Sequence, residues 1–152
     1  MRSMPFHVAS QPGTDFTGAC AQNAGLTADI VLARSLQRAG GESLAILKSI
    51  AITSVQNLAW ELWLMGNSGG ASGTIASENF YGRWTFNAAD AVQLAGAGLY
   101  HYYIDGLDVS YVDLDRVGKV HLLLINRSAV AKIAAAPGAV RVRIGLESAT
   151  GM

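Results

Sequence analysis

The residues of this chain that could carry out chemistry are few and scattered. The histidines are His7, His101 and His121, and they lie far apart in the sequence. A metal site of the cupin type would need clustered histidines with a carboxylate, and no segment has that local spacing. His121 lies in an apolar run, where a hydrogen-bonded core histidine is the more ordinary interpretation. We therefore predict neither a metal site nor a cofactor.

Aspartates gather in one segment and invite two chemical interpretations. The group consists of Asp105, Asp108, Asp113 and Asp115. A calcium loop would need a compact Asp-x-Asp-x-Asp-Gly array with a closing glutamate, which is not present. Glycoside hydrolysis could pair one of these carboxylates with Glu61 or Glu78, but nothing in the sequence fixes a separation or a raised pKa. Solvated turns explain the group better, and we name no catalytic pair.

Nucleophilic and phosphate-binding chemistry also lacks support. Cys20 is the only cysteine, and no active-site motif surrounds it, so we expect it to pack rather than react. No nucleophile elbow surrounds Ser35, Ser110 or Ser128. The glycine-rich segment 66–73 lacks the Gly-Lys-Ser/Thr ending of a phosphate-binding loop. We predict that the protein is not an enzyme.

The composition indicates a protein that associates with other proteins. Lys+Arg and Asp+Glu both number 11, so no basic surface suggests a nucleic-acid partner. Only 14% of the residues are charged and 51% are hydrophobic, a balance that leaves the surface open to association. No segment approaches the ~18 uninterrupted apolar residues of a membrane span, and no secretory signal is recognisable. We expect a soluble protein that docks or self-assembles, with neither nucleic acid nor membrane as partner.

Most of the chain alternates between apolar and polar residues, as β-strands do. The runs 44–53 and 60–64, joined by the turn-forming residues 54–57, predict a β-hairpin. The apolar run 119–126 suits a central strand buried on both faces, and 140–146 suits a strand with one buried face. Seven or eight short strands at roughly ten-residue spacing predict an all-β fold, a jelly-roll-like antiparallel β-sandwich. At most one or two short helices are expected, one of them over residues 88–94.

Residues 1–40 differ from the rest because prolines and glycines interrupt every period. They predict an extended N-terminal arm, and residues 41–152 then form the β-sandwich domain. We expect the arm to become ordered on a partner, with Phe6 and Phe16 as its anchors. The alternative is that the arm folds back as an edge strand.

Two pairs of aromatic residues predict an interface. Trp60 and Trp63 have opposite parity in one strand, as do Tyr102 and Tyr103, so one member of each pair must point away from the core. Aromatic side chains on an outer face are typical of protein interfaces. We take Trp63 and Tyr103 as the interface members.

From residue 44 to residue 146 the chain resembles the jelly-roll cement, or decoration, proteins that bind the outside of tailed-bacteriophage capsids. The motifs that carry the resemblance are Ile46-Leu47-Lys48-Ser49-Ile50-Ala51-Ile52, Leu58-Ala59-Trp60-Glu61-Leu62-Trp63-Leu64-Met65, Asn87-Ala88-Ala89-Asp90-Ala91 before Leu94-Ala95-Gly96, Val120-His121-Leu122-Leu123-Leu124-Ile125-Asn126-Arg127-Ser128 and Val140-Arg141-Val142-Arg143-Ile144-Gly145-Leu146. They are mostly apolar, and the stretch from residue 44 to residue 146 that contains them covers roughly two thirds of the chain.

The resemblance implies a structural virion protein that is made in the host cytoplasm and binds the outer capsid surface. Its partner would be the major capsid protein, and its role would be to stabilise contacts between shell subunits. We expect a homo-oligomer, a dimer or trimer, on the shell. Two alternatives stay open: a carbohydrate-binding module that displays Trp and Tyr to sugar rings, and an enzyme of the cupin kind.

Overall fold

The computed structural model describes residues 11–32, 44–66, 80–94, 98–112, 116–134 and 139–148. These residues form ten strands and one 3-10 turn, Ala88–Asp90. The strands are β1 (Gly13–Asp15), β2 (Gly25–Val31), β3 (Leu44–Ser54), β4 (Trp60–Met65), β5 (Phe80–Phe86), β6 (Val92–Leu94), β7 (Leu99–Ile104), β8 (Val109–Val112), β9 (Lys119–Asn126) and β10 (Val140–Ser148).

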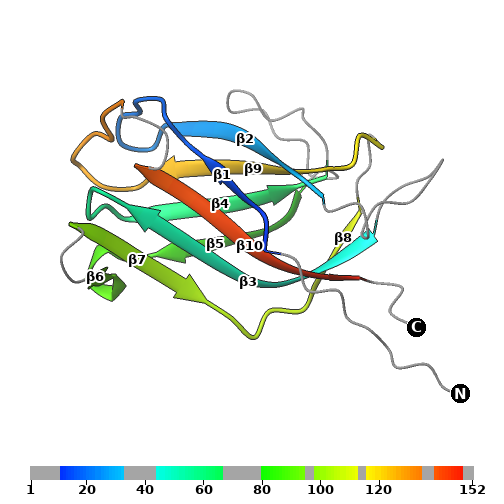
Figure 1. The fold of residues 1–152 in the computed structure, drawn as a ribbon. Coiled ribbons are helices and arrows are strands. Elements are labelled where there is room, and N and C mark those ends of the chain that lie inside the picture. The colour runs from blue at the N-terminus through cyan, green and yellow to red at the C-terminus, as the bar shows by residue number, and fades with distance from the viewer. Residues whose placement is uncertain are drawn as a thin grey trace, which may run out of the picture.

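The strands form two antiparallel sheets that face each other as two layers (Figure 1). One sheet has the order β1-β10-β3-β7-β6, with β8 also paired to β3, and the other has the order β2-β9-β4-β5. The pairings nest from the ends of the chain inward: β1 with β10, β2 with β9, β3 with β7 and β8, and β4 with β5. Successive nested pairs alternate between the sheets, which is the arrangement of a jelly roll. The predicted fold class is confirmed.

The first strands of the roll lie where we predicted an arm. β1 and β2 are edge strands, one in each sheet, and Phe16 donates its N–H to Val140 O at 2.9 Å. The prediction of an extended arm is therefore wrong for residues 11–32. The structure instead shows the alternative, in which this segment folds back as edge strands. Phe16 is 2% exposed in the core, so it cannot anchor a partner while the core is intact. Phe6 lies outside the described residues.

The core lies between the two sheets and is built by inward side chains of the strands other than β1 and β6, which have no buried residue. β10 contributes four residues at every second position, as its pattern predicted: Val140, Val142, Ile144 and Leu146. β9 is buried on both faces, which confirms the prediction from its apolar run. Its outward residues Leu123 and Ile125 form a second cluster with Met65, on the far side of the sheet from the main core.

The two runs predicted as a hairpin lie in different sheets. β3 pairs with β10, β7 and β8, whereas β4 pairs with β5 and β9. The connection between them turns at Ser54, whose Oγ accepts the Gln56 N–H at 3.1 Å. Tyr102 on β7 donates its hydroxyl to Leu58 O at 2.7 Å, which ties the connection to the first sheet. The turn residues therefore make a corner between the layers and no hairpin.

The alternation of β3 is interrupted at Lys48 by a β-bulge. The register of β3 with β10 shifts there, since Leu47 faces Leu146 and Ser49 faces Gly145. A bulge adds one residue and moves the following side chains to the other face. Ala45 and Leu47 before it and Ile50 and Ile52 after it consequently all reach the core.

The helix expected over residues 88–94 is wrong. Only Ala88–Asp90 coils, as a 3-10 turn, and β6 follows directly. The Asn87 side chain does not cap a backbone N–H, and instead donates from Nδ2 to Asp90 Oδ2 at 3.3 Å.

Candidate functional site

The outer face of the β1-β10-β3-β7-β6 sheet carries exposed and half-exposed side chains. We call it the open face, and the strand registers assign its members: Asp15 on β1; Arg141, Arg143 and Gly145 on β10; Ser49, Ala51 and Thr53 on β3; Leu99, His101 and Tyr103 on β7; Val92 and Leu94 on β6. None of them is buried. This face is therefore available to a partner.

An apolar strip runs along the β6–β7 edge of the open face. Val92 lies opposite His101 and Leu94 opposite Leu99, with Tyr103 next along β7. Val92 is 64% exposed, Tyr103 57% and Leu94 37%. The His101 and Tyr103 rings lie 6.1 Å apart at a tilt of 40°. The parity argument thus placed Tyr103 correctly on an outer face, and Tyr102 is buried.

The middle of the open face has small side chains on β3, and arginines follow on β10. The β3 residues at the centre are small, and so is Gly145 on β10, where a side chain would collide with Ser49 Oγ. Beyond them, Arg141 Nη1 forms an ion pair with Asp15 Oδ1 at 3.1 Å. Arg143 is exposed and makes no ion pair with any described residue. The open face therefore has an apolar edge, small side chains along β3, and an arginine, Arg143, that has no ion-pair partner among the described residues.

Trp63 points outward from the other sheet, but other side chains hold it. It packs against the Met65, Leu123 and Ile125 cluster, and Phe80 contacts it edge to face with ring centroids 5.0 Å apart. Trp63 is half-buried. It is thus on the predicted face, but it is much less available than Tyr103.

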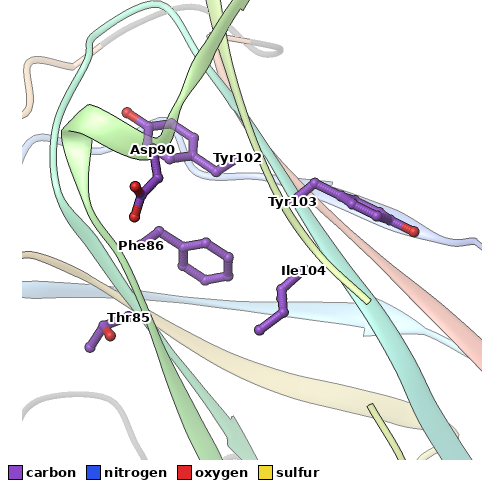
Figure 2. A pocket seen from close by; sticks show the side chains of 6 residues that line it. All are labelled: Thr85, Phe86, Asp90, Tyr102, Tyr103 and Ile104. Carbon is purple, nitrogen blue, oxygen red and sulfur yellow. The ribbon is translucent and has the colours of Figure 1, made fainter. Parts of the chain in front are cut away.

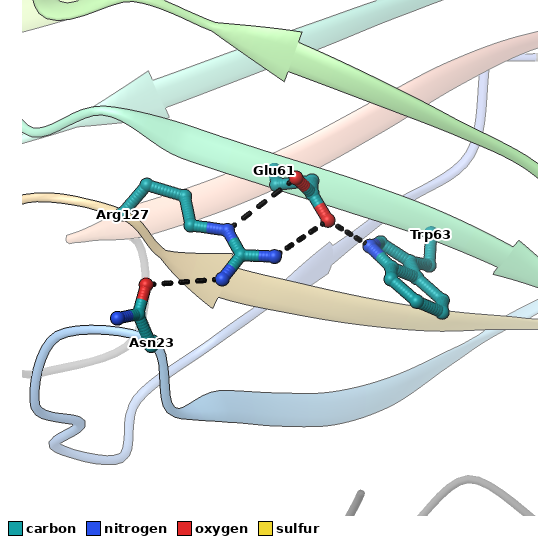
Figure 3. Close-up of polar contacts among 4 residues, drawn as sticks. All are labelled: Asn23, Glu61, Trp63 and Arg127. Carbon is teal, nitrogen blue, oxygen red and sulfur yellow. Dashed lines mark hydrogen bonds and ion pairs between the residues drawn. The ribbon is translucent and has the colours of Figure 1, made fainter.

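A polar network adjoins Trp63 (Figure 3). Trp63 Nε1 donates to Glu61 Oε2, and Arg127 donates to both oxygens of the same carboxylate. Arg127 Nη1 also donates to Asn23 Oδ1 at 3.0 Å. Burial raises the pKa of Glu61, but these donors together with the charges of Arg127 and Arg83 outweigh burial and hold the pKa below its ordinary value of 4.5. Such a carboxylate stays ionised, so it is suited to a structural role and unsuited to general-acid catalysis.

His121 and Cys20 occupy structural positions. His121 is 2% exposed, and its Nδ1 lies 2.7 Å from Asp29 Oδ1, in agreement with the hydrogen-bonded core histidine expected from the sequence. Cys20 is buried beside Lys132, and burial raises the pKa of its thiol despite the lysine charge. A protonated, buried thiol is a poor nucleophile.

A pocket of about 270 Å³ opens at the side of the sandwich, between β5 and β7. Its lining residues are Thr85, Phe86, Asp90, Tyr102, Tyr103 and Ile104. Figure 2 shows Phe86 and Ile104 directed toward each other across the pocket, and the Tyr103 side chain directed away from it. Sequence reasoning missed this site because β5 and β7 belong to different sheets. The only local feature of the sequence near this pocket is the spacing of Asn87 and Asp90.

Neither metal-binding groups nor membrane-spanning helices occur in the described ranges. No three His, Cys, Asp or Glu side chains there come together to hold a metal ion. No helix there has the length and apolarity to cross a bilayer.

Comparison with protein-family models, curated proteins and solved structures found no match to this chain. The class that fold and site define is a jelly-roll β-sandwich with one open sheet face.

Proposed function

We propose that this protein is a structural virion protein that binds the outer surface of a phage capsid and stabilises contacts between major capsid subunits. The observation that carries the proposal is the open face, with its exposed Val92, Leu94 and Tyr103. Exposed apolar residues that adjoin one another mark interaction sites, because their burial on docking removes apolar surface from water. The capsid as the partner follows from the resemblance in sequence pattern and in the jelly-roll fold.

The shape and charge of the open face fit a protein surface better than a small ligand. The small side chains of Ser49, Ala51 and Thr53 on β3 let another surface approach that strand closely. Arg143, which forms no ion pair with a described residue, favours an acidic group on the partner. The pocket between β5 and β7 lies at the border of this face. We therefore expect a broad contact with a shell subunit, repeated by symmetry over the capsid.

The carbohydrate-binding alternative has less support. A sugar platform uses aromatic rings that lie together on one surface. Of the described aromatic residues, Phe80 and Tyr103 are the exposed ones, and they belong to different sheets. A shared platform cannot be built from these two rings.

The proposal is tested by sedimenting the purified chain with empty capsids that lack decoration. We expect the chain to pellet with the shells at a fixed stoichiometry and to raise the temperature at which the shells break. The alternative is tested in parallel with a glycan panel followed by tryptophan fluorescence. Failure to bind the shells, or binding to glycans alone, would overturn the proposal.

A further inference from the structure

Asp90 brings a negative charge to the pocket between β5 and β7 that no described cation neutralises. Its carboxylate accepts a hydrogen bond from the neutral Asn87 Nδ2 at 3.3 Å. It forms no ion pair with a described residue, and none of the other lining residues is a cation. Asp90 is exposed to solvent at the pocket mouth. A cationic group entering the pocket would find a counter-charge that is not already in use.

The rest of the lining suits a cation that is carried on an apolar stem. Phe86 and Ile104 provide an apolar wall, and the Phe86 ring packs edge to face on Tyr102, with centroids 6.4 Å apart. Aromatic rings attract cations through the negative charge on their faces. The pocket therefore combines an apolar wall, aromatic rings and a carboxylate.

We propose that this pocket binds a primary alkylammonium group, that of a lysine side chain presented by the partner protein. The methylene stem lies along Phe86 and Ile104, and the ammonium group donates to Asp90. A pocket of about 270 Å³ is smaller than most sites for drug-sized ligands, which fits a single side chain. An arginine fork would use both oxygens of one carboxylate, and one oxygen of Asp90 already accepts a hydrogen bond from Asn87 Nδ2.

The position of Tyr103 connects the pocket with the open face. Tyr103 lines the pocket, while its side chain stands on the open face (Figure 2). A protein docked on the open face therefore borders the pocket and can extend a lysine into it. The identity of the partner rests on the proposed function, whereas recognition of the ammonium group rests on the pocket alone.

The test uses the full chain and small probes, so that it does not depend on capsids. Amide chemical shifts of ¹⁵N-labelled protein are followed during titration with Nα-acetyl-lysine methylamide. The norleucine methylamide analogue replaces the ammonium by a methyl group, and n-butylamine supplies the ammonium without a peptide backbone. Methyl glucoside tests for a neutral sugar ring. Failure of shell binding with intact binding of the lysine probe would overturn the docking function and leave the pocket assignment standing.

We expect the lysine probe to shift the amides of Thr85, Phe86 and Asp90, and the norleucine probe to leave them unchanged. Asp90→Asn should weaken lysine binding by about tenfold, the usual size of a lost charged hydrogen bond. Asp108→Asn is the matched control, since it removes the same charge from an aspartate paired with Lys48 elsewhere on the surface. Equal binding of norleucine, binding of glucoside instead of lysine, binding of butylamine alone, or equal losses in the two variants would each overturn the proposal.

Discussion

The guanidinium of Arg127 contacts both carboxylate oxygens of Glu61: Nε lies 3.3 Å from Oε1 and Nη2 lies 3.0 Å from Oε2. Glu61 is near the start of β4, and Arg127 directly follows β9, so the pair joins two neighbouring strands at one end of their sheet. The Glu61 side chain is 6% exposed and that of Arg127 36%. A carboxylate buried to this extent is stable in its ionised form only while its donors remain in place.

Removing the guanidinium should therefore destabilise the fold. We expect Arg127→Ala to lower the free energy of unfolding by about 2 kcal/mol, because it leaves a buried carboxylate with fewer donors. Urea denaturation measures this. Arg83→Ala is the control: Arg83 is exposed and acts on Glu61 only through its charge, so its loss should change stability by less than about 0.5 kcal/mol. Equal effects of the two substitutions would contradict a structural role for the ion pair.

The same network predicts how stability depends on pH. Because the folded-state pKa of Glu61 lies below its ordinary value of 4.5, the unfolded chain binds this proton more readily than the folded chain. The stabilisation from Glu61 is thus fully present above pH 4.5 and is lost as the pH falls through the folded-state pKa. Glu61→Gln should be less stable than the wild type at pH 7 but should lose less stability on acidification. Parallel curves for the two proteins between neutral and acid pH would refute this.

Gly145 and Ser49 should show strong coupling. A methyl group at position 145 would collide with Ser49 Oγ, but it would lie 3.5 Å from Ser49 Cβ, an ordinary contact distance. We expect Gly145→Ala to lower the unfolding free energy by about 1 kcal/mol, since Ser49 must leave its rotamer or the strands must shift. Adding Ser49→Ala should restore most of that loss. A double-mutant cycle measures the coupling, and additive effects would show that the contact does not limit this position.

The corner between the sheets should depend on the Tyr102 hydroxyl. This hydroxyl lies 2.7 Å from Leu58 O and 3.0 Å from Asn57 Oδ1 in an almost fully buried position. Tyr102→Phe removes the donor and should cost about 1 to 2 kcal/mol of unfolding free energy. Tyr103→Phe, on the exposed side of the same strand, should be nearly neutral. Thermal unfolding of both variants checks the difference, and a neutral Tyr102→Phe would contradict it.

The fold class could be predicted because period-two alternation is local in sequence. The apolar run of β9 predicted a strand buried on both faces, and the alternation in β10 predicted a strand with one buried face. Both burial patterns are observed. The same reasoning failed for β1 and β2, because the glycines in this segment look like interruptions between elements of secondary structure. In the structure, a side chain at Gly25 would come within 2.8 Å of Leu123 Cδ1, so this glycine allows the edge strand to approach β9 closely.

Strand partners and the pocket could not be predicted, since both depend on contacts between distant segments. Turn residues 54–57 are equally compatible with a hairpin and with a corner, and only the pairing of β4 with β9 decides between them. Parity correctly separated Tyr102 from Tyr103. The alternation of side chains within one strand could not predict that Phe80 on β5 covers Trp63 on β4, because that contact joins different strands.

The most direct test of the central claim compares two valines in the shell-binding assay. Val92 on the open face and Val31 on β2 of the other sheet are each 64% exposed, so aspartate at either site should affect folding similarly. If the open face docks on the capsid, Val92→Asp should weaken co-sedimentation with empty shells by about tenfold or more, because it places an unpaired charge in the interface. Val31→Asp should bind like the wild type. Retained binding by Val92→Asp, or equal losses in both variants, would contradict the account.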